Sequence, residues 1–217
     1  MTDEKSIDVD IDLSQYKKED FKRMTWEKYG EILETLYRKV EKYIKENNIG
    51  IDAVVPILRG GAFPGTYLAY RLSLLRIIPI QYKYFFHDGD LSKIKLKRLL
   101  DFPKDVNLPE NPTFLLVEQN MCFGTTVISA AEHLKKIYPN CKIILAADTM
   151  DYSYRDFDIF EAIFWGTLNN DTKELSIEEA KKLGIETDLS LFPWENLEEE
   201  YTTVQAKQFK FKDLGCV

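Results

Sequence analysis

The sequence predicts an α/β fold in which helices flank a parallel sheet. Apolar runs of strand length alternate with amphipathic helical segments, and the order strand–helix–strand occurs three times. Such an order requires right-handed crossovers between parallel strands. With 217 residues, 45 % of them hydrophobic, the chain can bury one substantial core. We expect an N-terminal arm over residues 1–20 and a single domain over residues 21–217, with a small C-terminal hood region.

The first helix is predicted from Thr25 to about Asn47. Thr25 is a suitable N-cap, and Asn48 and Gly50 end the pattern. Apolar residues recur at the three-and-four spacing of one buried helix face. These residues are Tyr29, Ile32, Leu33, Leu36, Val40, Tyr43 and Ile44. In the arm before this helix, Ile7, Val9, Ile11 and Leu13 alternate with polar residues and are compatible with an edge strand.

A strand and a second helix enclose the first candidate anion site. Ile51–Leu58 is a nearly continuous apolar run, typical of a strand buried on both faces of a parallel sheet. Arg59, Gly60 and Gly61 connect it to a helical pattern over Pro64–Leu75. The glycines allow close approach of the backbone to a ligand, and an arginine suits phosphate oxygens. The alternative is an ordinary turn with a surface arginine, and we favour the anion site.

The next strand is predicted over Ile77–Phe86, where aromatic residues alternate with other side chains. Residues 87–112 are polar and charged and contain three prolines near their end. An irregular segment of this length inside a compact domain is often a functional lid. The basic part, Leu91–Leu100, is equally compatible with a solvent-exposed helix.

A second strand–turn–helix unit is the most informative part of the chain. The strand Phe114–Val117 and the helix Val127–Ile137 enclose a polar turn. A helix N-terminus after a tight turn binds phosphate, because free amide groups and the helix dipole meet the anion there. An ordinary βα turn is the alternative. The turn contains Glu118, Gln119, Asn120, Cys122, Phe123, Gly124, Thr125 and Thr126. Both candidate loops directly follow parallel strands, whose carboxyl ends are the usual ligand-binding edge of such a sheet.

The remaining elements are predicted as a strand over Lys142–Ala147, a strand over Ile159–Leu168 and a short helix over Ser176–Leu183. Within the second of these strands, Phe164 and Trp165 are able to stack on a planar base. Core aromatics at a strand end are the alternative.

Composition and charge exclude several classes of protein. The net charge of −7 and the pI near 5.1 argue against nucleic acid as the main partner. No apolar run approaches the roughly 18 residues of a membrane span. The N-terminus is acidic where a secretory signal is basic and then apolar. Three cysteines without metal-ligand spacing favour a reducing, cytoplasmic environment.

The second loop resembles that of type I phosphoribosyltransferases, nearest the 6-oxopurine branch. In that family the loop has an acidic pair, two apolar residues, Asp, Thr or Ser, Gly, any residue and Thr. When the loop is aligned with this pattern, Glu118 and Gln119 occupy the positions of the acidic pair. Cys122 occupies the position of the Asp, and Phe123 that of the hydroxyl residue. Gly124 and Thr126 match the pattern. The resemblance extends to Arg59-Gly60-Gly61, in the place of the family's pyrophosphate loop. It also includes Phe192-Pro193-Trp194-Glu195 near the C-terminus.

This resemblance implies transfer of phosphoribosyl from phosphoribosyl pyrophosphate (PRPP) to a nucleobase, a purine in this branch, with Mg²⁺ and release of pyrophosphate. It places Glu118 and Cys122 in catalytic roles, with Glu118 also acting indirectly on the metal. It assigns PRPP and its 5′-phosphate to Gln119, Phe123 and residues 124–126, and pyrophosphate to residues 59–61. It assigns the base to Phe164 and Trp165, within a base-side segment of about residues 159–200. Residues 87–112 correspond to the family's flexible loop, and the family's assembly implies a homodimer.

Three departures from the family pattern leave the activity open. Cys122 replaces the Asp that handles the proton on the purine ring, and a thiol is a poor general base unless its pKa is lowered. Phe123 replaces a hydroxyl donor to the 5′-phosphate. The lysine that contacts the ring oxygen has no counterpart at Thr149, Met150 or Asp151. One hypothesis is an active enzyme with altered base specificity, in which Asp148 or Asp151 would replace the lost acid. The other is an impaired homologue that binds PRPP or a nucleotide as a sensor or regulatory subunit.

Overall fold

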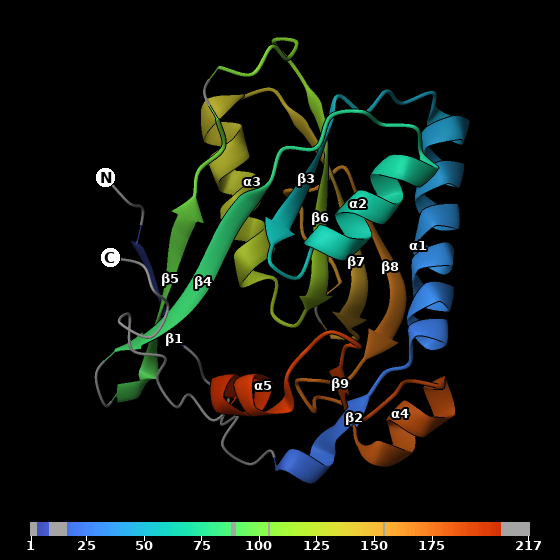
Figure 1. Cartoon of the computed structure of the whole chain (residues 1–217), viewed down its shortest axis with the longest axis vertical. Coiled ribbons are helices and arrows are strands. Elements are labelled where there is room, and N and C mark those ends of the chain that lie inside the picture. Colours follow the sequence, from blue (N-terminus) through green and yellow to red (C-terminus); the bar gives the residue numbers. More distant parts are fainter. Residues whose placement is uncertain (1–3, 9–16, 88–89, 104, 154, 205–217) are drawn as a thin grey trace. The chain divides into compact units, whose positions relative to one another are not determined.

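The computed structural model describes residues 4–8, 17–87, 90–103, 105–153 and 155–204 (Figure 1). The chain forms two compact units. The larger unit contains Gly30–Gln81 and Leu100–Thr187, and the smaller contains Met1–Tyr29, Tyr82–Leu99 and Asp188–Val217. The single domain expected over residues 21–217 stays a prediction.

The larger unit contains a parallel sheet, which confirms the predicted α/β class. Its strands are β3 (Ala53–Leu58), β6 (Thr113–Met121), β7 (Lys142–Asp151) and β8 (Ala162–Asn169), hydrogen-bonded in the order β3-β6-β7-β8. All three strand pairs are parallel. On the other side of β3, the first two residues of β4 (Ile80–His87) also pair in parallel. The strand β8 is the last in the order.

Helices pack on both faces of this sheet (Figure 1). From α1 (Trp26–Asn47) and α2 (Ala62–Arg71), buried apolar residues meet alternate residues of the strands. This core cluster contains Leu36, Val40, Val54, Leu68, Ala69, Leu115, Val117, Ile144 and Ala146. The opposite face is covered by α3 (Thr125–Ile137), whose buried residues are Val127, Ala130, Ala131 and Leu134.

The sequence signals at helix ends act as predicted. The amide of Lys28 donates to Thr25 Oγ1 at 3.2 Å, so Thr25 caps α1. The short helix α4 (Ile177–Leu183) begins at a capping box between Ser176 and Glu179 and ends at Gly184 in the left-handed conformation.

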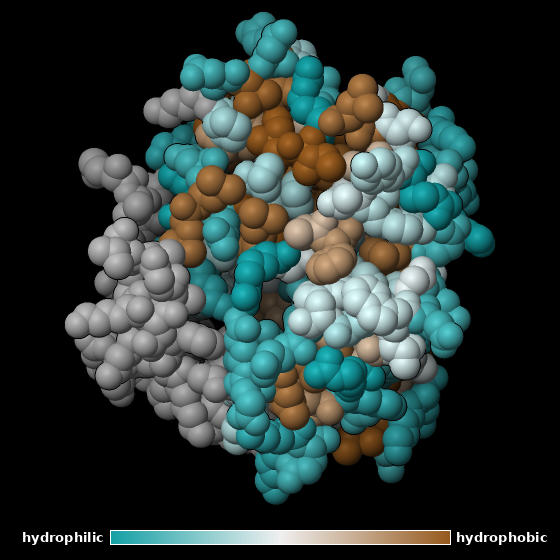
Figure 2. All heavy atoms as spheres, viewed as in Figure 1, coloured by the Kyte–Doolittle hydropathy of each residue, from teal (hydrophilic) through white to brown (hydrophobic). Residues whose placement is uncertain are grey.

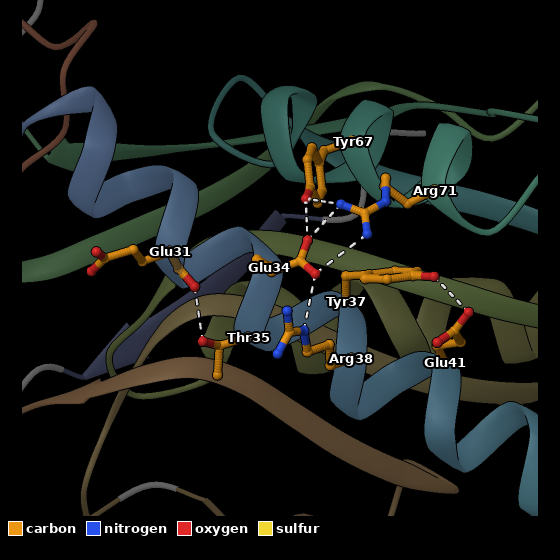
Figure 3. A network of polar contacts seen from close by, with 8 residues as sticks. All are labelled: Glu31, Glu34, Thr35, Tyr37, Arg38, Glu41, Tyr67 and Arg71. Carbon is orange, nitrogen blue, oxygen red and sulfur yellow. Dashed lines mark hydrogen bonds and ion pairs between the residues drawn. The ribbon is translucent and has the colours of Figure 1, made fainter.

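A polar network joins α1 to α2 in the larger unit (Figure 3). The carboxylate of Glu34 accepts hydrogen bonds from Tyr67 Oη at 2.9 Å and Arg38 Nε at 3.0 Å, and it pairs with Arg71. The Arg71 guanidinium lies 4.0 Å from the centroid of the Tyr37 ring. Hydrogen bonds from Arg71, Tyr67 and Arg38 lower the pKa of Glu34 to about 2. The network fixes α2, which begins directly after Gly61.

The smaller unit corrects the expected structure of residues 87–112. Residues Asp90–Leu100 form the strand β5, next to β4 and paired antiparallel with β1 (Glu4–Asp8). The helix expected over Leu91–Leu100 is therefore wrong. Lysines and apolar residues alternate from Lys93 to Lys97, which is the period of a strand. Residues 101–103 and 105–112 contain no helix or strand. Of the expected N-terminal edge strand, Ile7 lies in β1, and Val9, Ile11 and Leu13 lie outside the described residues.

The smaller unit also contains η2 (Lys18–Asp20), β2 (Phe21–Arg23), β9 (Leu189–Leu191) and α5 (Leu197–Val204). The strand β2 pairs in parallel with β9. The Phe-Pro-Trp-Glu segment follows β9, and its aromatic rings pack around Tyr29. The ring centroids of Tyr29 and Trp194 are 4.8 Å apart, and those of Tyr29 and Phe192 are 5.8 Å apart.

On the face shown in Figure 2, hydrophobic residues form patches that are bordered by hydrophilic residues. The exposed large hydrophobic residues include Phe63, Tyr70, Leu75 and Ile77. Within the described part of the chain, none of the helices combines the length and apolarity that a membrane span requires.

Candidate functional site

The two predicted anion loops lie side by side at the carboxyl ends of neighbouring strands. The strand β3 ends at Leu58 and leads through residues 59–61 into α2. The strand β6 ends at Met121 and leads through residues 122–124 into α3. Because β3 and β6 pair in parallel as far as Pro56 and Val117, both loops emerge at the same edge of the sheet.

The first loop is packed tightly against β6. A Cβ atom on Gly61 would clash with the carbonyl oxygen of Val117 and lie 2.8 Å from that of Ile57. On Gly60, a Cβ atom would lie 2.7 Å from the Cβ of Gln119. Only glycine fits at these positions. The structure thus brings Gly60 and Gly61 together with Gln119, as the sequence predicts. Arg59 is exposed, and the peptide bond between Leu58 and Arg59 is cis.

The second loop ends at the N-terminus of α3. Gly124 is the N-cap residue and has a φ of 76°, in the left-handed region that favours glycine. No side chain caps this helix end, and Thr125 and Thr126 are partly exposed in its first turn. The amide groups of this turn are the orphan donors that a phosphate can accept from. Phe123 is also partly exposed.

An aromatic side chain that the sequence analysis did not consider lies against this loop. A Cβ atom on Gly124 would come within 2.7 Å of the Phe157 ring, from the segment between β7 and β8. Phe157 therefore packs directly against the N-cap residue of α3.

The residues of the predicted polar turn lie in β6, because the strand extends to Met121. Glu118 and Gln119 are consequently strand residues, and the expected turn over residues 118–120 is wrong. Alternation separates the two side chains: Gln119 is 7 % exposed and lies against Gly60, whereas Glu118 is partly buried on the other face. Glu118 Oε1 accepts a hydrogen bond of 2.8 Å from the amide of Gln119. Burial raises the pKa of Glu118 to about 8, so its carboxyl group holds a proton near neutral pH.

Cys122 has an environment that keeps its thiol protonated. Burial and the negative charges of Asp171 and Asp151 raise its pKa well above the usual value. A thiol that holds its proton cannot take one from a substrate. This result agrees with the expectation from the sequence that Cys122 is a poor replacement for the family's Asp.

Asp171 is the carboxyl group that the sequence analysis missed. It follows β8 and is 8 % exposed. Its Oδ2 accepts hydrogen bonds of 2.9 Å from Asn120 Nδ2 and from Asn169 Nδ2. Asn120 Oδ1 in turn accepts from Thr149 Oγ1 at 2.8 Å. Burial raises the pKa of Asp171 to about 6, although the two amide hydrogen bonds act in the opposite direction.

The two acids considered as replacements, Asp148 and Asp151, are both fully buried at 0 % exposure. Asp151 is occupied by structural hydrogen bonds, because it accepts from the amides of Ser153 and Thr172 and from Thr172 Oγ1. Asp171 shares the carboxyl edge of the sheet with Cys122. The rule that ligands gather at strand ends could have identified it, since Asn169-Asn170-Asp171 ends the predicted last strand.

Phe164 and Trp165 do not join these loop residues. Phe164 packs against the core cluster, with its ring centroid 5.2 Å from that of Tyr43 in α1. The backbone oxygen of Trp165 accepts a hydrogen bond of 2.7 Å from Lys39 Nζ. Both residues line a hollow beside α1.

A parallel sheet with two glycine loops and a helix N-terminus at one edge is an arrangement typical of phosphate-binding α/β proteins. The sequence profile described as "phosphoribosyl transferase domain" matches residues 26–169, so the chain belongs to the phosphoribosyltransferase family. Among curated protein sequences, none matches this chain at a significant level.

Solved structures of low sequence identity share the fold. A purine phosphoribosyltransferase from Pyrococcus horikoshii is 17 % identical, with a TM-score of 0.55 over 82 % of this chain and 95 % of that one. The Helicobacter pylori xanthine-guanine-hypoxanthine phosphoribosyltransferase is 15 % identical, with a TM-score of 0.56 over 84 % and 99 %. A hypothetical protein from Neisseria gonorrhoeae with bound ppGpp is 14 % identical, with a TM-score of 0.62 over 86 % and 96 %.

Proposed function

We propose that this protein transfers phosphoribosyl from PRPP to a nucleobase of the purine class and releases pyrophosphate. The observation that carries the proposal is the contact between the first glycine loop and β6, the strand that leads into the second loop. Gly60 packs on Gln119 of the strand that leads into the second loop, so a single ligand with two phosphate groups can reach both loops. PRPP is such a ligand.

The roles of the loop residues follow from their positions. The amides of the first turn of α3, with Thr125 and Thr126, would bind the 5′-phosphate. Arg59 and the backbone at Gly60 and Gly61 would bind the departing pyrophosphate. Donors fixed in place before the reaction stabilise the charge that develops on the leaving group.

Glu118 would contact a ribose hydroxyl. With a pKa of about 8, it is a neutral acid near pH 7 and is able to donate as well as accept a hydrogen bond.

Asp171 is the proposed proton acceptor. When a ring nitrogen of the base bonds to C1′ of the ribose, the C1′–O bond to pyrophosphate breaks and the nitrogen loses its proton. The pKa of Asp171, about 6, leaves the carboxylate ionised at pH 7 and close enough to neutrality for general base catalysis. The amides of Asn120 and Asn169 would hold it in position.

Mg²⁺ fits this site as an ion that arrives with PRPP. Within the described residues, no three His, Cys, Asp or Glu side chains form a metal-binding group. Mg²⁺ commonly uses one or two carboxylates together with substrate phosphates and water. Glu118, a neutral acid near pH 7, would act on the ion only indirectly, through a water molecule, and the ion would neutralise charge on the departing pyrophosphate. The homodimer and the cytoplasmic location stay predictions.

A second candidate function is a sensor that binds PRPP or a nucleotide without turnover. The protonated states of Cys122 and Glu118 favour it, because both positions lack the charge that the enzymes of the resembled branch carry. The bound ppGpp in the Neisseria gonorrhoeae structure makes ppGpp a ligand to test. In a sensor, the phosphate loops alone would be used.

Pyrophosphate release separates the two functions. The purified chain is incubated with Mg²⁺, PRPP and each common nucleobase, and thermal unfolding is recorded on the same samples and with ppGpp. Release that requires a base establishes the transferase and names its substrate. A raised melting temperature without release favours the sensor, and neither signal contradicts both.

Two variants test the assigned residues. Asp171→Asn should reduce release at least about 100-fold at pH 7, and it should not weaken the thermal stabilisation by PRPP. Restoring the family loop with Gln119→Asp and Cys122→Asp together should raise the activity. A wild-type rate in Asp171→Asn would show that another group accepts the proton.

A further inference from the structure

A hollow of about 380 Å³ lies between the second half of α1 and β8. Its volume falls within the usual range for small-molecule sites. None of the residues of the two glycine loops lines it. The lining residues are Lys39, Lys42, Tyr43, Glu46, Ile163, Phe164 and Trp165. This hollow is therefore distinct from the site proposed for PRPP.

Aromatic rings form much of its wall. Tyr43 and Phe164 contact each other with an interplanar angle of 54°. Trp165 contributes a third ring, and Lys39 Nζ lies 5.1 Å from its centroid. Such surfaces favour a flat, apolar ligand, because stacked and edge-on rings add to the free energy of burial.

Lys39 brings a positive charge into this apolar surrounding. Burial lowers the pKa of its ammonium group, which shows that the charge is poorly solvated. One of its three hydrogens is used by the carbonyl oxygen of Trp165. Among the described residues, no carboxylate forms an ion pair with Lys39, whereas Lys42 pairs with Glu46 at 3.8 Å. An anion in the hollow would therefore supply the missing counter-charge.

The same hydrogen bond argues for a small molecule and against a peptide strand. In the described sheet β8 is the last strand, so a peptide could in principle extend it. Lys39 already occupies the carbonyl oxygen of Trp165, to which an added strand would bond. A compact ligand leaves this hydrogen bond intact.

We propose that the hollow between α1 and β8 binds a small planar aromatic anion. Its ring would pack against Phe164 and Trp165, and its carboxylate or sulfonate would pair with Lys39. This inference does not depend on the proposed transferase activity.

Calorimetric titration with 2-naphthoate tests the proposal. The wild-type chain should bind it with a dissociation constant of roughly 0.1–1 mM, as expected for a ligand of this size. The uncharged 2-naphthamide should bind at least about tenfold more weakly, because it cannot pair with the ammonium group. Saturating PRPP with Mg²⁺ should leave the 2-naphthoate affinity unchanged.

Two lysine variants provide the matched comparison. Lys39→Met retains an unbranched side chain without the charge and should weaken 2-naphthoate binding at least about tenfold. Lys45→Met removes the same charge from an exposed position of α1 and should change it less than twofold. Thermal unfolding of each variant verifies that it is folded.

Three results would overturn the proposal: no binding by the wild-type chain, equal binding of acid and amide, or displacement of 2-naphthoate by PRPP. Equal affinities of the wild type and Lys39→Met would place the probe elsewhere. Should Lys39→Met fail to fold, the affinities of the wild-type chain for 2-naphthoate and 2-naphthamide still test the proposal.

Discussion

The loop at Gly60 and Gly61 and the loop at Gly124 follow neighbouring parallel strands, yet they need glycine for different reasons. At Gly61 the backbone of Val117 and Ile57 occupies the space of a side chain. At Gly124 the residue adopts a φ of 76°, and the neighbouring atoms belong to the movable ring of Phe157. The first loop is thus confined by main chain and the second by its own conformation.

This difference indicates which loop is able to change. A loop confined by main-chain atoms keeps one shape unless the strands move apart. A loop that contacts a side chain can be altered when that side chain adopts another rotamer. Two of the three departures from the family pattern, those at Cys122 and Phe123, lie in the second loop, and the third lies in β7. We expect the second loop to accommodate a substitution more readily than the first.

The largest effect is expected for Gly61→Ala. The added Cβ atom would contact two backbone carbonyl oxygens that cannot withdraw, so the free energy of unfolding should fall by about 3 kcal/mol. Gly30→Ala is the control: nothing lies within 4 Å of its Cβ position in α1, and it should stabilise by about 0.5–1 kcal/mol. Urea unfolding measures both. A cost below about 0.5 kcal/mol at Gly61 would show that the first loop adapts as the second does.

A smaller effect, about 2 kcal/mol, is expected for Gly124→Ala. It combines the cost of the left-handed conformation, about 1–2 kcal/mol, with the contact to Phe157. Gly184→Ala isolates the first contribution, because Gly184 has a φ of 66° and no atom within 4 Å of its Cβ position. In the background of Phe157→Ala, the cost of Gly124→Ala should fall to that of Gly184→Ala. An unchanged cost in that background would exclude the ring as the constraint.

The smallest effect, taken per pH unit, is the dependence of the free energy of unfolding on pH. The pKa of Glu118 is about 8 in the folded protein and about 4.5 when unfolded, so the folded state binds the extra proton between these values. The contribution of Glu118 is fully present below pH 4.5 and is lost as the pH rises to 8, by at most about 1.4 kcal/mol per pH unit.

Urea unfolding between pH 7 and 8 separates this contribution from that of Asp171, whose pKa lies near 6. Glu118→Gln should reduce the slope over this range, and Glu31→Gln, at an exposed position of α1, should leave it as in the wild type. Identical slopes in the wild type and Glu118→Gln would show that Glu118 is ionised in the folded protein.

Periodicity and end signals predicted α1 to α4, because these signals are local, whereas α5 was not predicted. Thr25, Ser176 and Gly184 act at helix ends as their residue types suggest. Over Leu91–Leu100, the many charged residues were compatible with an exposed helix, but the segment forms the strand β5. There the alternation of lysines with apolar residues was a better guide than the composition. The strand β6 extends through Glu118 and Gln119, since pairing with β7 continues to Met121 regardless of polarity.

The site was only partly predictable for a related reason. The residues within each glycine loop are consecutive in sequence, so the residue types and their spacing could be recognised directly. Asp171, the proposed proton acceptor, is held by Asn120, which is 51 positions away in the chain, and no local pattern encodes that contact. Phe164 and Trp165 were recognised as aromatic, but the fold decides that they face α1.

The positions of the tryptophans allow the unfolding of each unit to be followed separately by fluorescence. Trp26 and Trp194 lie in the smaller unit with their ring centroids 5.7 Å apart, whereas Trp165 lies in the larger unit. Fluorescence of a Trp165→Phe variant would follow the smaller unit alone. A variant that retains only Trp165 would follow the larger one. Comparing the two melting curves would reveal whether the units unfold together or in succession.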